Sequence, residues 1–267
     1  MISYREGPAP PALARWVESF WELRVTAVGV RAVSRIIPDG SADLVFHLGD
    51  IPARATARAY VVGPLLRSVT IDYAPDTHVV GACLRPAGVR ALLDVTPHDL
   101  ANRVAPLDDV CGTMGAHLSN TVIDGPPHAA VRRLSAELLA RASSLALPDV
   151  AASEAIRLIR RSGGRISMDA LAPLVGLSPR QLERRFSAAV GVSPKVFARL
   201  ARFDGVVRDI RQHGLNRGWA TLAVDHGYHD QAHLVHEVRA FAGITPVELL
   251  AEVHPVGFLQ YEPAAAR

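Results

Sequence analysis

Hydrophobic positions follow different periods in the two halves of the chain. Before residue 84, apolar runs of four to seven residues end at turn signals such as Pro38-Asp39-Gly40 and Gly63-Pro64. From residue 150 onwards, apolar residues recur at intervals of three and four, as on one face of a helix. The pattern predicts an α+β protein. Its N-terminal part is a mixed domain with a small antiparallel sheet or barrel plus helices, and its C-terminal part is all-α.

The N-terminal half is expected to begin with an amphipathic segment. In residues 11–23, Trp16, Phe20 and Leu23 recur at helical spacing, which predicts a short helix or a helical entry into a strand, with these side chains in the core. Strands are expected at 33–37, 43–48, 59–62, 68–73 and 78–84, and helices at 88–93, 108–120 and 126–142.

The segment Ser178–Val190 carries the clearest helix signals in the chain. Ser178 can cap the helix, Pro179 suits its first position, and Gln181 completes an S-x-x-Q capping box. On a helix with about 100° per residue, two faces separate. Leu182, Phe186 and Ala189 form the apolar face, and Arg180, Glu183, Arg184 and Ser187 form the opposite one.

The polar face of this helix suits the major groove of DNA. Arginine can make two hydrogen bonds to guanine O6 and N7, and glutamate can accept from cytosine N4. A surface helix with a solvated, charged face would have the same pattern. Between residues 178 and 217 the chain holds nine basic and three acidic residues, a local charge of +6 within a net charge of +3. This concentration of charge favours a nucleic-acid partner.

The helix also belongs to an internal repeat. The segment 167–175, a turn with Gly176, and Ser178–Val190 read as helix, turn, helix, although Pro173 fits poorly inside the first helix. A similar unit ends at Gly243, and a long helix that opens at Ser193-Pro194 joins the two. Positions 52 residues apart match: Leu182 with Leu234, Phe186 with Val238, Gly191 with Gly243, and Ser193-Pro194 with Thr245-Pro246. Two such units would enter successive major-groove segments of double-stranded DNA, about 34 Å apart.

The segment from about residue 149 to 252 resembles the DNA-binding domain of AraC/XylS-type transcriptional regulators. LAPLVGLSPRQLERRF, the following GVSP and LAVDHGYHDQAHLVHEVRAFAGITP carry the resemblance. The N-terminal half, with RIIPDGSADLVFHLG and RPAG, looks like an uncharacterised sensor domain that precedes such domains. The expected organisation is a sensor or dimerisation domain at 1–142, a linker at 143–148, the DNA-binding domain at 149–254 and a tail at 255–267. Phe258, Leu259 and Tyr261 predict that this tail packs back onto the body.

The resemblance implies which residues contact DNA. In the first unit the base-reading places fall on Arg180, Glu183 and Arg184, on the polar face already described. In the second they fall on Ala232, Val235 and His236, where Ala and Val offer only apolar contact with a thymine methyl. We therefore expect the first unit to supply most of the base specificity. The full set of expected DNA-binding residues is Arg180, Gln181, Glu183, Arg184, Ser187, Gln231, His233, His236 and Arg239.

The N-terminal half carries no catalytic motif, P-loop or dinucleotide-binding signature. We expect no enzyme activity and no cofactor. A barrel can enclose a small-molecule effector, whose identity the sequence leaves open, and a dimerisation or protein-contact module is the alternative. A homodimer is an expected partner, and the resemblance implies contact with RNA polymerase.

Two further alternatives involve cysteine and histidine. A DNA-targeted alkyl-transfer repair protein would need an activated thiol at Cys83 or Cys111, but both lie in apolar surroundings. His229 and His233 share the spacing of a metal pair, but no third ligand completes a usual site, so no metal is expected. The absence of CxxC spacing, a signal peptide and a long apolar run favours a cytoplasmic protein without a membrane span.

Overall fold

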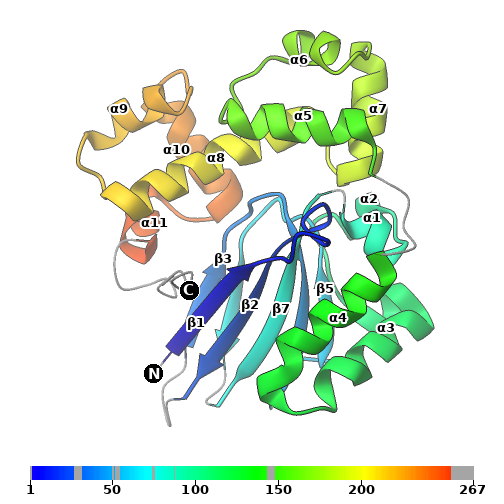
Figure 1. Ribbon diagram of the computed structural model, residues 1–267. Helices are drawn as coiled ribbons and strands as arrows, with labels where there is room; N and C mark the ends of the chain where they lie inside the picture. The colour runs from blue at the N-terminus through cyan, green and yellow to red at the C-terminus, as the bar shows by residue number, and fades with distance from the viewer. Residues whose placement is uncertain are drawn as a thin grey trace.

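The computed structural model describes residues 2–26, 32–49, 51, 55–73, 76–86, 88–142 and 148–253. An N-terminal domain of sheet and helices lies against a C-terminal domain of helices alone (Figure 1). The α+β class and its division into a sheet-containing and an all-helical domain are confirmed.

The N-terminal domain is built on a six-stranded antiparallel sheet in the order β1-β2-β7-β4-β5-β8. Its central pairs are extensive: β2 runs beside β7 from Val17 opposite Leu84 to Arg24 opposite His78. A second sheet pairs β3 with β6. The strands are β1 (Ile2–Pro8), β2 (Val17–Val25), β3 (Ala32–Ile36), β4 (Ala42–His47), β5 (Ala59–Val62), β6 (Val69–Tyr73), β7 (His78–Leu84) and β8 (Val104–Pro106).

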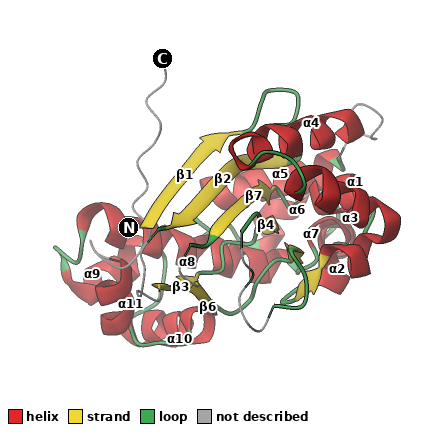
Figure 2. Cartoon of the chain, turned by 90° about the horizontal axis from the view of Figure 1, so that it is seen from below, coloured by secondary structure: helices red, strands yellow, loops and turns green. Residues whose placement is uncertain are grey.

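Helices α3 and α4 cover one face of the large sheet, while β3 and β6 lie on its other side (Figures 1 and 2). Every second residue of β4 and β7 points into the core under these helices, where Leu44, Phe46 and Val80 are fully buried. The helices of this domain are α1 (Gly88–Leu93), α2 (Pro97–Leu100), α3 (Leu107–Ile123), the short η1 (Pro127–Ala129) and α4 (Ala130–Ala142).

Of the two forms expected for residues 11–23, the short helix was wrong, and the entry into a strand is present but runs through turns. Residues 11–16 form turns, and β2 begins at Val17 between β1 and β7. Pairing on both sides satisfies the backbone groups of residues 17–25, and this gain outweighs the helical spacing of the aromatic residues. Trp16, Phe20 and Leu23 are nevertheless buried, as expected of core residues.

The C-terminal domain consists of two similar helical units on one connector. The first unit is α6 (Met168–Leu174) and α7 (Pro179–Val190), preceded by α5 (Val150–Arg161). The connector is α8 (Pro194–His213). The second unit is α9 (Gly218–Asp225) and α10 (Gln231–Ala242), followed by α11 (Pro246–Val253). The helix-turn-helix repeat predicted from the sequence is therefore present in the fold.

The connector α8 belongs to two cores at once. Phe197, near its start, packs with Leu182 and Phe186 of α7 in the first core. Phe203, further along, packs with Leu234 and other residues of α10 in the second. Because both cores need α8, the two units are held on one rigid element.

Other elements lay outside the expectations. The strands β1 and β8 and the short helices α2 and α11 were not predicted. The expected linker lies almost wholly outside the described residues, as does the expected tail from residue 255 with Phe258, Leu259 and Tyr261.

Candidate nucleic-acid interface

The start of α7 is built as its sequence predicts. The backbone N–H of Gln181 donates to the Ser178 hydroxyl over 3.3 Å, and Gln181 Oε1 accepts from the Ser178 backbone N–H over 2.9 Å. Both bonds of the capping box are therefore present. Gly191 ends the helix in the left-handed conformation with φ of 87°.

The two faces of α7 separate as predicted. Leu182 and Phe186 are 1% and 0% exposed, and the Phe186 ring meets that of Phe197 edge to face. On the opposite face Arg180, Glu183 and Arg184 are exposed and Ser187 is half-buried. Within the described residues, neither arginine nor Glu183 has an ion-pair partner, so their polar groups are available to a ligand. Contact with DNA through these four residues remains a prediction.

Helix α10 repeats this frame with different residues. Asp230 caps it by accepting from the His233 N–H over 2.7 Å, and this bond holds the pKa of Asp230 below its usual range. Leu234 and Val238 are fully buried, and Gly243 ends the helix with φ of 71°. The exposed side forms a shallow hollow of about 570 Å³ lined by Gln231, Ala232, Val235, His236 and Arg239.

Fewer of the exposed polar residues are charged on α10 than on α7. On α10 they are Gln231, His233 and His236 at its start and middle and Arg239 in its last turn. One of them is already engaged, because His233 Nδ1 accepts from the backbone N–H of His229 over 3.4 Å. The His233 ring also lies edge-on to Tyr228 over 5.2 Å. The DNA-binding role of these residues also remains a prediction.

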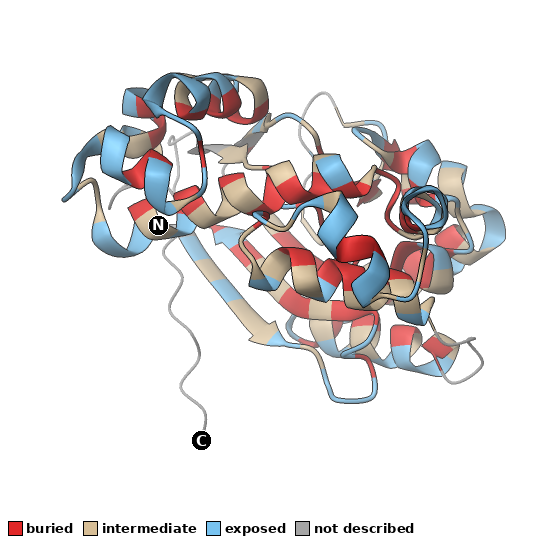
Figure 3. Ribbon diagram, turned by 90° about the horizontal axis from the view of Figure 1, so that it is seen from above, coloured by how far each residue is buried: buried red, intermediate tan, exposed pale blue. Residues whose placement is uncertain are grey.

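Figure 3 shows that helices of the protein carry both buried and exposed positions along their turns. The turns that precede α7 and α10 have equivalent backbone hydrogen bonds. Gly176 and Gly227 both adopt positive φ, and the following N–H groups of Leu177 and Tyr228 donate to Ala172 and Ala223. The second turn contains one further residue, His229, before its cap.

Ion pairs that the sequence does not predict hold α7 and α10, the two helices expected to read bases and called the reading helices below. In α10, the carboxylate of Glu237 is buried at 3% exposure and takes two hydrogen bonds, of 2.7 and 3.1 Å, from Arg199 of α8. These bonds raise the pKa of Arg199. The equivalent position in α7 is Arg185, whose Nε donates to Asp149 Oδ2 over 2.8 Å. Because the partners are 38 and 36 residues apart, no local spacing pointed to them.

The two units also touch directly. Arg202 of α8 donates to the carbonyl of Gly164, before α6, and to that of Gly227, in the second turn. Arg165 donates to the carbonyl of Asp225 at the end of α9. These bonds join the first unit to the turn of the second.

The histidines and cysteines do not form a reactive centre among the described residues. No group of three or more His, Cys, Asp or Glu side chains there could hold a metal ion. His226 instead bonds to Asp209 over 2.9 Å and lowers the pKa of that carboxyl. Burial raises the pKa of Cys111 to about 11 and that of Cys83 well above its usual value. Both thiols are thus kept protonated, which counts against the alkyl-transfer alternative.

Comparison with known proteins agrees with this geometry. Residues 171–252 match a family described as a helix-turn-helix domain. The C-terminal domain is an AraC-type helix-turn-helix domain. Residues 5–106 match a domain of unknown function (DUF6597). No curated protein matches the chain in sequence.

Solved structures of ToxT from Vibrio cholerae share 8 to 11% identity with the chain. ToxT from strain O395 aligns over 96% of this chain and 98% of its own, with a TM-score of 0.44. An unsaturated fatty acid-bound ToxT from strain SCE256 aligns over 98% of this chain and 97% of its own, with a TM-score of 0.42.

The AraC-type domain makes this chain a DNA-binding transcription regulator. The match begins at Leu171 in α6 and ends at Glu252 in α11, so it includes both units and the connector.

No helix within the described ranges is long and apolar enough to cross a membrane.

Proposed function

We propose that the protein regulates transcription by reading a bipartite site in double-stranded DNA, with α7 as the principal base reader. The observation that carries this proposal is the contrast between two helices in equivalent frames. Helix α7 exposes Arg180, Glu183 and Arg184, whereas α10 exposes Ala232 and His236 with a half-buried Val235 between them. A guanidinium discriminates bases by paired hydrogen bonds, while Ala and Val offer only apolar contact.

Phosphate contacts would come from the flanking polar groups. Gln231, His236 and Arg239 surround the shallow hollow on α10, and Ser187 borders the exposed face of α7. Such contacts fix the register of a protein on DNA without reading its sequence. The second unit would then contribute mainly affinity and the first mainly specificity.

The experiment selects binding sites from a random pool of duplex DNA with the wild-type protein. It then repeats the selection with Arg184→Ala and His236→Ala. Arg184→Ala is expected to relax the preference at one base pair and to cost about 1–3 kcal/mol on the wild-type site. His236→Ala should weaken binding to all sequences similarly. A loss of specificity equal for both variants, or no selected sequence at all, would contradict the proposal.

Control by a small-molecule effector bound to the N-terminal domain is part of the proposal. A hollow of about 160 Å³ on the N-terminal domain, lined by Ser3, Arg5, Glu22 and Arg24 of β1 and β2, is the place that we propose for such an effector. Homodimer formation, contact with RNA polymerase and the domain boundaries at 142, 148 and 254 also remain predictions.

A further inference from the structure

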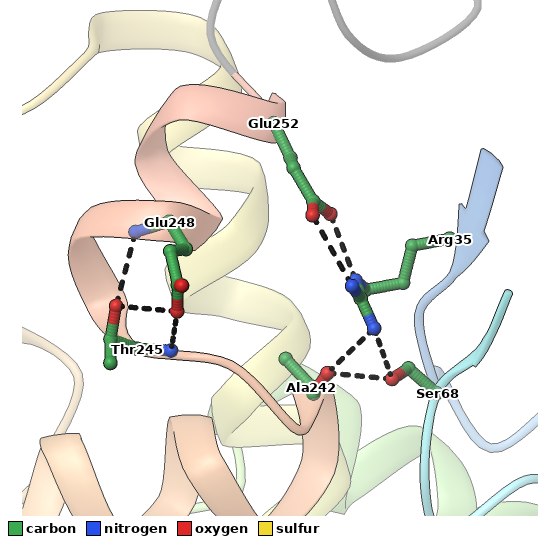
Figure 4. Close-up of polar contacts among 6 residues, drawn as sticks. All are labelled: Arg35, Ser68, Ala242, Thr245, Glu248 and Glu252. Atoms are coloured by element: carbon green, nitrogen blue, oxygen red, sulfur yellow. Dashed lines mark hydrogen bonds and ion pairs between the residues drawn. The ribbon is translucent and has the colours of Figure 1, made fainter. Parts of the chain in front are cut away.

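The C-terminal end of α10 is capped by the N-terminal domain. The last carbonyls of a helix have no partner within it. Here the backbone N–H of Ser68 donates to the Phe241 carbonyl over 2.7 Å. The Ser68 hydroxyl donates to the Ala242 carbonyl over 2.6 Å (Figure 4). Two acceptors at the end of the second reading helix are therefore satisfied by a residue just before β6.

Arg35 of β3 reinforces this contact and extends it to α11. Its Nη1 donates to Ser68 Oγ and to the Ala242 carbonyl, each over 3.3 Å, while Nε and Nη2 donate to the two carboxylate oxygens of Glu252 over 2.9 and 3.3 Å (Figure 4). The side chain is 20% exposed. A cation beside these carbonyls also matches the partial negative charge of a helix C-terminus.

Helix α11, which carries Glu252, is capped at its start. Thr245 and Glu248 form a reciprocal cap at the start of α11, in which Thr245 N–H donates to Glu248 Oε2 over 2.7 Å and Glu248 N–H donates to Thr245 Oγ1 over 3.3 Å (Figure 4). Glu252 lies one turn further along the same helix. Arg35 therefore binds both the end of α10 and the capped helix that follows it.

The N-terminal domain holds the equivalent end of α7 as well. Gly191 occupies the place of Gly243 in the repeat, and its carbonyl lies 3.3 Å from His98 Nδ1 of α2. A Cβ at Gly191 would stand 2.5 Å from the carbonyl oxygen of Pro97, so the two backbones are in direct contact. One domain thus contacts the same end of both reading helices.

We propose that Arg35 and Ser68 are positioning residues that fix α10 relative to α7 and so set the spacing between the two DNA half-sites. This proposal rests on the proposed function. The N-terminal domain contacts the C-terminal ends of α7 and α10, whereas the expected base-reading residues lie toward their N-terminal ends. A tilt of either helix at its C-terminal end would therefore move its base-reading residues. Connector α8 and the bonds of Arg165 and Arg202 join the units to each other, and the N-terminal domain adds a second, independent constraint.

The test uses DNA selected from a random pool by the full-length wild-type protein. Its spacer between half-sites is lengthened or shortened by one and two base pairs, and a single half-site serves as a further probe. One base pair rotates the second half-site by about 34°, so wild-type affinity should fall roughly tenfold for each change. For Arg35→Ala and Ser68→Ala, the affinity should fall less than about threefold for each change of spacer length. Their affinity for a single half-site should equal that of the wild-type protein.

The matched control is Arg58→Ala, which removes an exposed arginine that donates to the Leu48 carbonyl within the N-terminal domain. It should keep the wild-type spacing preference. Arg35→Glu combined with Glu252→Arg restores an ion pair of reversed polarity and should recover part of the preference that Arg35→Glu alone loses. Arg35→Lys, which keeps the charge without the planar fork, should lie between wild type and Arg35→Ala.

The outcomes separate the two proposals. If the wild-type protein selects no DNA sequence, the proposed function fails. If it selects a bipartite site but Arg35→Ala keeps the wild-type spacing dependence, only the positioning role fails. An equal loss of affinity on single and double half-sites, with a lowered melting temperature, would also overturn the positioning role, because it would show a purely structural contribution.

Discussion

The two helix-turn-helix units of this domain have the same turn and cap geometry but expose different side chains. Both have a left-handed glycine in the turn, a side-chain cap at the start of the reading helix and a left-handed glycine at its end. The first exposes two arginines and a glutamate that have no ion-pair partner among the described residues. The second has exposed Ala232 and His236 and a half-buried Val235 at the matching places. Backbone geometry is thus repeated where it positions a helix, and side chains diverge where they would meet DNA.

Their interiors differ as well. Phe186 fills the first core, where the second has the smaller Val238. In the second core, Phe241 stacks on Phe203 over 5.3 Å and supplies the missing aromatic surface from another position. The ion pairs also differ, because Glu237 is almost fully buried while Arg185 and Asp149 are 41% and 30% exposed.

The largest expected effect tests this difference in packing. Phe186→Ala should destabilise the first unit by about 3–5 kcal/mol, because it removes a ring from a site with no exposed surface. Val238→Ala removes only two carbons and should cost about 2 kcal/mol. Urea denaturation followed by circular dichroism measures both changes. Equal losses would mean that the two cores are equally dependent on this position.

The next effect separates a buried ion pair from an exposed one. Arg199→Met keeps much of the side-chain bulk but leaves the Glu237 carboxylate buried without its partner, so it should cost about 3 kcal/mol. Arg185→Met breaks a solvent-exposed pair and should cost much less than Arg199→Met. Thermal unfolding at low and high salt tests the contrast, since salt should reduce only the Arg185 effect. A larger loss from Arg185→Met would reverse our ranking.

The smallest effect concerns the caps. Ser178→Ala should cost about 1 kcal/mol, because it leaves the Gln181 N–H without its acceptor. Gln181→Ala should cost a fraction of that amount, since α7, unlike α10, has the reciprocal bond to the cap residue. In α10 the matching residue is His233, whose ring accepts from His229 instead. Amide exchange in the first turn of each helix would detect the loss. An equal effect from His233→Ala in α10 would make the two caps equivalent.

The two units also differ from the rest of the fold in how far local sequence predicts them. The caps, the turn glycines and the two faces of α7 depend on residues within one or two turns, so local spacing predicted them. Residues 11–23 stayed open between a helix and an entry into a strand because Trp16, Phe20 and Leu23 follow helical spacing. The strand partners of β2 in β7 lie up to 67 residues away, so local spacing does not reveal them. The contacts Arg199–Glu237 and Arg35–Glu252 depend on tertiary approach and leave no pattern in either segment.

The connector α8 has a consequence for evolution of the chain. Its 20 residues span about 30 Å, close to one turn of duplex DNA. Because each residue advances a helix by about 1.5 Å and turns it by about 100°, a single insertion in α8 would rotate the second unit away from the groove. A change of about seven residues, two full turns, would restore the rotation but would move the second unit by about 10 Å. Insertions and deletions in α8 are therefore expected to disturb DNA binding even where both units still fold.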